Sequence, residues 1–132
     1  FLNISHNKFH GSLPFELGHL RRLKVMSIRV NDISGEIPPS IGMLQQLQHL
    51  NVGYNSLSGN IPSVVFNVSS LRMTILWGNS LTGGLPNNIC DNLPDTKEIF
   101  VNENRLSGSI PSNLSSCRRL QILDLAHNAF SG

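Results

Sequence analysis

Residues 55–62 read Asn-Ser-Leu-Ser-Gly-Asn-Ile-Pro, and the chain repeats this stretch along its whole length. Close variants occupy residues 31–38, 79–86 and 104–111; a first copy spans 7–14, and a last copy, 128–132, stops before its Pro. The numbers of the leading Asn residues differ by 24, 24, 24, 25 and 24, and these residues are Asn7, Asn31, Asn55, Asn79, Asn104 and Asn128. Self-similarity at a fixed period of about 20 to 29 residues is typical of a solenoid, in which each unit stacks on the next.

The overall composition argues against some classes of partner. Only 14% of the 132 residues are charged, and the formal net charge is +2. Nucleic-acid binding normally requires a concentrated basic patch, so we expect no nucleic-acid partner. No run of about 18 apolar residues is present, so we expect no membrane span within the chain, and no signal peptide is recognisable. Neither end has the polar outer face of a capping repeat, so we interpret residues 1–132 as an internal piece of a longer array.

Each unit begins with a short apolar segment that ends at the Asn. Apolar residues stand eight, five and three places before it, for example Leu47, Leu50 and Val52 before Asn55. The last two alternate with polar residues, which is the period-two pattern of a strand with one buried face. Six such strands, stacked at roughly 4.8 Å, predict one continuous parallel sheet.

The residues after each strand predict how the unit closes. The Asn amide offers donors and an acceptor to backbone groups, so we interpret the six Asn residues as a structural ladder. The Gly that follows permits positive φ, and the Pro suits a turn out of a short second strand. The segment from the Pro to the next Leu, such as residues 38–44, is too short for a free-standing helix and predicts a helical or 3₁₀ turn.

The full pattern, L-x-x-L-x-L-x-x-N-x-L-S-G-x-I-P-x-x-I/L-G, resembles the plant-specific class of leucine-rich repeats, and residues 50–59 and 123–132 are close to its consensus. The resemblance covers essentially all 132 residues and is greatest to ectodomains of plant leucine-rich-repeat receptor-like serine/threonine kinases, including immune receptors. It implies an α/β repeat solenoid, a right-handed superhelix with a parallel β-sheet on its concave side and short 3₁₀ or helical segments on its convex side. It also implies a location on the extracellular side of the plasma membrane, a peptide or protein ligand, a co-receptor of the same class, and a transmembrane segment outside these residues.

Two units depart from the pattern. Thr74 replaces the apolar residue five places before Asn79, and the unit before Asn104 has one extra residue within 87–96. We expect the extra residue to bulge on the convex side and the fold to tolerate both departures.

The two cysteines, Cys90 and Cys117, fall in neighbouring units, four and six residues after their Pro. An extracellular location permits a disulfide. The offset between the two positions argues against suitable geometry. The pattern therefore favours two buried, unpaired cysteines that pack as small hydrophobic residues, with pairing as the alternative.

Three N-glycosylation sequons, at Asn3, Asn67 and Asn113, fit a secretory route. Asn67 and Asn113 fall in convex segments, where a glycan is harmless to the fold. Asn3 points to the concave side, so its use is the least expected of the three.

The concave face holds the candidate binding residues. The residues six, four, two and one places before each Asn point away from the core, so unusual residues there indicate function. An apolar patch with a charged rim is typical of a binding hot spot, where Trp, Tyr and Arg are enriched. The alternatives are that the aromatic residues only stabilise the sheet as cross-strand pairs, or that a glycan or loop covers them. We predict ligand or co-receptor contacts by Arg29, Tyr54, Met73, Ile75, Trp77, Phe100 and Glu103.

No residue pattern indicates catalysis, a metal site or a cofactor. His6 and His127 lie five strands apart, on the order of 24 Å, whereas zinc ligands lie about 2 Å from the metal. No serine is paired with a base and an orienting acid, and neither a phosphate-binding glycine loop nor a kinase signature is present. We expect no catalytic residue, metal or cofactor in this chain.

Recognition is therefore the predicted function, as part of a receptor-like kinase in immune or developmental signalling whose kinase domain lies outside these residues. A receptor-like protein without a kinase is one alternative. A secreted inhibitor that resembles polygalacturonase-inhibiting proteins is another, and a spacer that sets the curvature between distant binding regions is a third.

Overall fold

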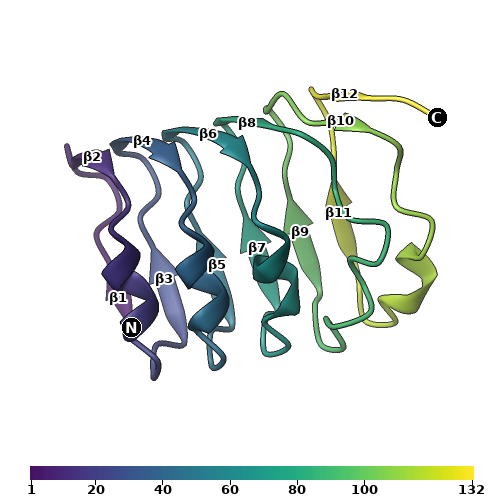
Figure 1. Cartoon of the computed structure of the whole chain (residues 1–132), viewed down its shortest axis with the longest axis horizontal. Coiled ribbons are helices and arrows are strands. Elements are labelled where there is room, and N and C mark those ends of the chain that lie inside the picture. Colours follow the sequence, from purple (N-terminus) through teal and green to yellow (C-terminus); the bar gives the residue numbers. More distant parts are fainter.

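The computed structural model describes residues 1–132. Its units stand side by side in sequence order from the N-terminus to the C-terminus (Figure 1). One strand of each unit pairs in parallel with the corresponding strand of the next unit, which confirms the predicted six-stranded sheet and the solenoid fold. The strands of this sheet, in spatial order, are β1 (Leu2–Asn3), β3 (Val25–Ser27), β5 (His49–Asn51), β7 (Met73–Ile75), β9 (Glu98–Phe100) and β11 (Ile122–Asp124).

A second row of short strands follows the ladder Asn residues and runs along the upper edge of Figure 1. The Gly of the repeated stretch adopts a φ of +77° at Gly35 and +73° at Gly59, a backbone conformation that other residues rarely adopt. This row is divided into a four-stranded parallel sheet and a separate pair. The four strands are β2 (His10–Ser12), β4 (Asp32–Glu36), β6 (Ser56–Asn60) and β8 (Ser80–Thr82), and the pair is β10 (Ser107–Gly108) with β12 (Ala129–Phe130).

All helical segments are 3₁₀ turns, as expected for segments too short to form a stable α-helix. They are η1 (Phe15–His19), η2 (Pro39–Met43), η3 (Ser63–Asn67) and η4 (Leu114–Ser116). The first three begin directly after the Pro of their unit, which occupies the N-cap position with φ between −72° and −58°. No helix has the length and apolar character needed to cross a bilayer.

The hydrophobic core is one cluster of 27 buried residues that passes from unit to unit. The apolar residues five and three places before the ladder Asn point into it, and Leu50 and Val52 are each 1% exposed. Thr74 occupies the same position in β7 and is fully buried, and its hydroxyl has no hydrogen-bond partner. The register of β7 with both neighbours is nevertheless regular, so the fold tolerates this departure.

The ladder Asn residues join each unit to the one before it. The Nδ2 of Asn55 donates to the Ile28 carbonyl of the preceding unit at 3.0 Å and to the Val52 carbonyl of its own unit at 3.1 Å. Its Oδ1 accepts from the backbone N–H of Ile33 at 3.1 Å. One amide therefore satisfies backbone groups that would otherwise be buried without partners.

The extra residue of the 25-residue unit lies outside the six-stranded sheet. Residues 87–92 form turns in place of a 3₁₀ helix. Across the insertion, Thr74 pairs with Ile99, just as Leu50 pairs with Thr74 in the regular unit before it. The chain therefore absorbs the insertion between Pro86 and β9, where no strand register has to be kept.

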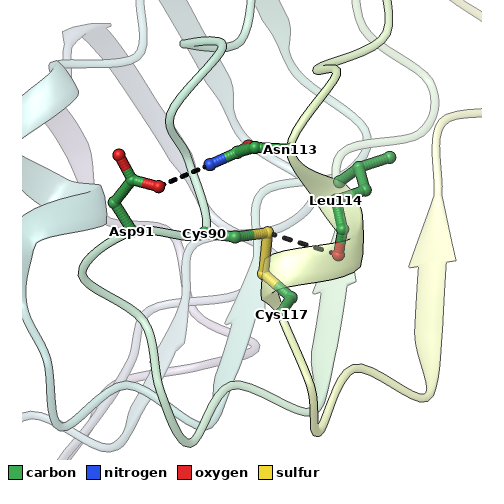
Figure 2. The surroundings of a disulfide bond; sticks show 5 residues. All are labelled: Cys90, Asp91, Asn113, Leu114 and Cys117. Atoms are coloured by element: carbon green, nitrogen blue, oxygen red, sulfur yellow. Dashed lines mark hydrogen bonds between the residues drawn. A yellow bond between two sulfur atoms is a disulfide. The ribbon is translucent and has the colours of Figure 1, made fainter.

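Our expectation of two unpaired cysteines was wrong, because Cys90 and Cys117 form a disulfide (Figure 2). Their Cα atoms are 4.9 Å apart, within the usual range of about 4.4 to 6.8 Å for disulfides. The Cys90 Sγ also lies 3.8 Å from the carbonyl oxygen of Leu114, as a packing contact only, since a disulfide sulfur carries no hydrogen. Both residues are buried, at 3% and 5% exposed.

The two cysteines can pair because the last helical turn starts later after its Pro than the others do. Helices η1 to η3 begin one residue after their Pro, whereas η4 begins three residues after Pro111. The turn that contains Cys90 begins directly after Pro86. The first hydrogen bond of the Cys90 turn joins the Ile89 N–H to the Pro86 carbonyl, whereas that of the η4 turn joins the Ser116 N–H to the Asn113 carbonyl. Each Cys directly follows the donor residue, so the later start of η4 compensates for the offset of the two cysteines in sequence.

Candidate functional site

The solvent-facing side of the six-stranded sheet, which we term the open face, corresponds to the predicted concave face. The side chains four places before each ladder Asn form a row across it. In this row Asn51 pairs with Ile75, Ile75 with Phe100, and Phe100 with Asp124. Ile75 and Phe100 are both half-buried. The parallel register thus places two apolar side chains side by side between two polar ones.

Each strand leaves the sheet through a left-handed residue directly before the ladder Asn. The five residues other than Gly at this position have φ between 50° and 57°. This conformation is unfavourable for most residues, and most of all for a β-branched one such as Val30. Five of the six units place a residue other than Gly in this turn. The need for a left-handed backbone therefore does not determine which residue type stands at this position. The residues are His6, Val30, Tyr54, Gly78, Glu103 and His127.

Two glycines, Gly53 and Gly78, leave room for the aromatic rings of the neighbouring units. A Cβ at Gly53 would overlap the indole Cδ1 and Nε1 of Trp77. A Cβ at Gly78 would lie 2.8 Å from Cδ1 of Tyr54. The rings of Tyr54 and Trp77 are in contact, with centroids 4.7 Å apart and planes inclined at 54°. Each ring therefore occupies the space that a side chain on the opposite strand would fill.

A hollow of about 320 Å³ opens beside this aromatic pair, and we call it the open-face hollow. Its apolar residues come from β7, from β9 and from the residues just after β7, and its polar residues come from β5, from β11 and from the residues just after β3 and β9. The lining residues are Arg29, Asn51, Ile75, Trp77, Phe100, Asn102 and Asp124.

Several polar atoms around the open-face hollow have no hydrogen-bond partner. The Nε of Arg29, the Nε1 of Trp77 and the Oδ1 of Asn102 are buried and unpaired. A buried unpaired group costs about 1 to 3 kcal/mol. Such groups are uncommon in native structures, and each one needs a functional or structural explanation.

Backbone donors are also free just after β7 and β9. In β5 and β11, Asn51 and Asp124 each accept a hydrogen bond from the backbone N–H two residues later, at 3.1 and 3.0 Å. In β7 and β9 the same row holds apolar side chains that cannot accept. The corresponding N–H groups, those of Trp77 and Asn102, donate to no protein acceptor. The apolar part of the open face, around Ile75 and Phe100, therefore also has two backbone N–H groups that are free to donate hydrogen bonds.

The structure brings together four of the seven predicted binding residues, since Arg29, Ile75, Trp77 and Phe100 line the open-face hollow. Tyr54 lies outside it but packs on Trp77 and remains 43% exposed.

The other two predicted residues lie away from the open-face hollow. Met73 stands two residues before Ile75, in register with Glu98. Glu103 is exposed in the left-handed turn after β9.

Our list of candidate residues omitted three polar lining residues, Asn51, Asn102 and Asp124. The row assignment places all three on the concave face, so the signal was present. Their place in the hollow depends on which apolar side chains stand beside them on the neighbouring strands, and the residue type alone does not indicate this.

The three sequons differ in their surroundings. Asn67 is exposed, and its Oδ1 accepts from Asn92 at 3.0 Å, which leaves its Nδ2 free. Asn113 is half-buried, and its Nδ2 donates to Asp91 at 2.7 Å beside the disulfide (Figure 2). Asn3 is exposed on β1 of the open face.

The family model described as Leucine Rich Repeat matches residues 1–20, 22–44 and 46–68, together half of the chain. A search of curated proteins returns no match.

Solved structures of plant receptors have the same fold. The ectodomain of the Arabidopsis thaliana membrane receptor kinase GASSHO1/SCHENGEN3, in complex with CASPARIAN STRIP INTEGRITY FACTOR 2, is 34% identical over 98% of this chain with a TM-score of 0.94. The Arabidopsis receptor kinase HAESA, in complex with the peptide hormone IDA and the co-receptor SERK1, is 28% identical over 98% with a TM-score of 0.94. The plant peptide hormone receptor RGFR1, in complex with RGF2, is 34% identical over 99% with a TM-score of 0.72.

The chain spans only part of these structures. It covers 15% of the GASSHO1/SCHENGEN3 chain, 22% of the HAESA chain and 25% of the RGFR1 chain.

Proposed function

Because the chain belongs to the leucine-rich repeat family, we propose that it is a ligand-recognition segment of a plant receptor kinase ectodomain and that its open face binds a peptide or protein. The observation that carries the proposal is the open-face hollow, where Trp77 and Phe100 stand beside unpaired donors. In this proposal a co-receptor of the same class joins the complex, and the kinase domain lies outside these residues. Signalling in immunity or in development is the proposed context.

The disulfide and the sequons support an extracellular location for the proposed receptor segment. Disulfides persist in secreted and cell-surface proteins and are rare in reducing compartments. N-glycosylation occurs only on the secretory route, and the exposed Asn67 is accessible for it.

Two features favour recognition over a purely structural role for the aromatic residues. Aromatic pairs across strands do stabilise sheets, and Tyr54 with Trp77 is such a pair. Phe100, however, has no aromatic partner and lines a hollow whose lining residues include unpaired polar atoms. Stabilising the sheet does not require donors that remain unsatisfied, whereas binding a ligand uses them.

The test is selection of linear peptides from a phage-displayed library on the secreted chain, followed by affinity measurements on three variants. Trp77→Ala and Phe100→Ala should each weaken the selected peptides by about tenfold or more, as at a binding hot spot. Phe15→Ala is the matched control, because Phe15 is 56% exposed on η1, away from the open face, and should bind as wild type. Unchanged binding by the first two variants, with normal circular dichroism, would reject the proposal in favour of a spacer.

A further inference from the structure

Opposite charges stand at the two ends of the open-face hollow. Arg29 lies just after β3 at one end, and Asp124 ends β11 at the other. Neither forms an ion pair in the chain, whose one salt bridge joins Arg119 to Asp95 away from this face. The Arg29 Nε is buried without an acceptor, and one Asp124 carboxylate oxygen is already used by the N–H of Ala126. Both side chains retain capacity for a charged partner.

Other charged residues stand around the open face but outside the hollow. Glu98 and Glu103 stand on and just after β9, so carboxylates gather toward the C-terminal end of the open face. The basic residues Lys24, Arg72 and Lys97 are exposed directly before β3, β7 and β9, at the edge where the strands begin. Arg29 is therefore the one permanent cation among the lining residues, with Asp124 the one anion.

The separation of the two charges matches an extended peptide. Arg29 and Asp124 belong to units four strands apart, which corresponds to roughly 19 Å at about 4.8 Å per strand. An extended chain advances about 3.3 Å per residue, so residues about six positions apart in a peptide would reach both. Between them, Ile75 and Phe100 offer an apolar surface to the middle of that peptide.

We propose that the open-face hollow selects an extended peptide segment that lies across the strands, with an acidic group at Arg29, a basic group about six residues away at Asp124, and apolar side chains between them. This rests on the proposed function and adds the charge pattern and the placement of the ligand. An acidic group is an Asp or Glu side chain or the carboxyl terminus, and a basic group is a Lys or Arg side chain or the amino terminus.

Three synthetic peptides of equal length and apolar middle test the charge pattern. One has Asp near one end and Lys near the other, six positions apart; the second has Asp at both positions, and the third has Lys at both. All are blocked at their termini and free of aromatic residues. Trp77 is the only tryptophan of the chain and lines the open-face hollow, so its fluorescence reports binding directly.

The mixed peptide should bind about threefold to fivefold more tightly than either of the others at low salt, the range expected for one exposed ion pair gained. Raising the salt concentration should reduce this difference, because exposed pairs are screened. Arg29→Glu should change the preference to the Lys-Lys peptide, and Asp124→Lys should change it to the Asp-Asp peptide. Arg22→Glu, an exposed charge reversal outside the hollow, should leave the order unchanged.

The outcomes separate this inference from the proposed function. If Phe100→Ala weakens all three peptides while neither charge reversal changes the preference, the open face binds peptides but the charge pattern is wrong. Equal affinity of the wild type for all three peptides, or no binding of any, also overturns the inference. Circular dichroism of each variant, and retention of wild-type preference by Arg29→Lys, exclude unfolding as the cause of a change.

Discussion

The N-terminal units and the unit between Asn79 and Asn104 build the same sheet by different means. In the former, a five-residue 3₁₀ helix follows each Pro, and neighbouring helices pack on each other, as η1 does on η2. In the latter, turns replace the helix, and a disulfide to the next unit takes over its role as the link between units. The six-stranded sheet therefore sets the spacing of the units, while the opposite side of the solenoid accommodates either a 3₁₀ helix or a disulfide-linked turn.

Removing the disulfide should cause the largest change in stability. The double variant Cys90→Ala/Cys117→Ala opens a loop closed across a separation of 27 residues. On the chain-entropy estimate this costs about 3 to 4 kcal/mol in the free energy of unfolding. Urea unfolding, followed by circular dichroism, measures the loss. A loss below about 1 kcal/mol would show that the turns at 87–92 hold the unit without the disulfide.

Gly53→Ala should disturb the open face of the regular part. Its Cβ would overlap the indole of Trp77, so the ring has to move, at a cost of about 1 to 3 kcal/mol for overpacking. The emission maximum of the single tryptophan and its quenching by acrylamide should both change. Gly84→Ala is the control, since the added Cβ would lie 3.3 Å from the Ser107 carbonyl oxygen and far from the indole. An unchanged Trp77 spectrum would mean that the ring does not rest on Gly53.

Thr74→Val should stabilise the strand that leads into the irregular unit. The Thr74 hydroxyl is fully buried without a partner, and Val has the same shape without the polar atom. The expected gain in the free energy of unfolding is about 1 kcal/mol. Thr82→Val, at an exposed position, should change the stability little. Destabilisation by Thr74→Val would indicate that the hydroxyl has a partner after all.

Glycan occupancy should differ between the regular part and the unit that the disulfide joins to the irregular one, with the smallest effect on stability. We expect Asn67, in the regular part, to carry a glycan, because it is exposed and its Nδ2 is free. Asn113, tied to Asp91 beside the disulfide, should be occupied less often. Mass spectrometry of tryptic peptides from the secreted chain measures both. Asn67→Gln should remove that glycan and change the free energy of unfolding by less than about 0.5 kcal/mol; higher occupancy at Asn113 would contradict the ranking.

Most of the fold followed from local pattern. The period of the Asn residues predicted the six strands, and the alternation within each strand predicted which residues are buried. The rows of the open face were also predictable, because in a parallel sheet with one strand per unit the same position of every unit falls in the same row. Ile75 and Phe100 occupy the same position of neighbouring units, so residue spacing alone predicts that they lie side by side, and the register of β7 with β9 confirms it.

The candidate site was predicted less completely. The sequence pointed to Trp77 and Arg29, which line the same hollow, but the missing side chain at Gly53 that leaves room for the indole is revealed only by a view across strands. The left-handed turn that carries Tyr54 and Glu103 was also missed, because non-Gly residues in that conformation have no distinctive sequence signal.

The repeat, the parallel sheet, the buried and exposed rows and the family could all be predicted from the sequence, because they depend on residue spacing within one unit. The three-dimensional structure was needed to show that Cys90 and Cys117 pair, that the aromatic rings pack against glycines of neighbouring units, and that a hollow with opposite charges at its ends opens on the sheet. Those features depend on contacts between units. These contacts depend on where each helical turn starts and on whether the neighbouring unit has a glycine at the facing position. The pattern of a single repeat contains neither kind of information.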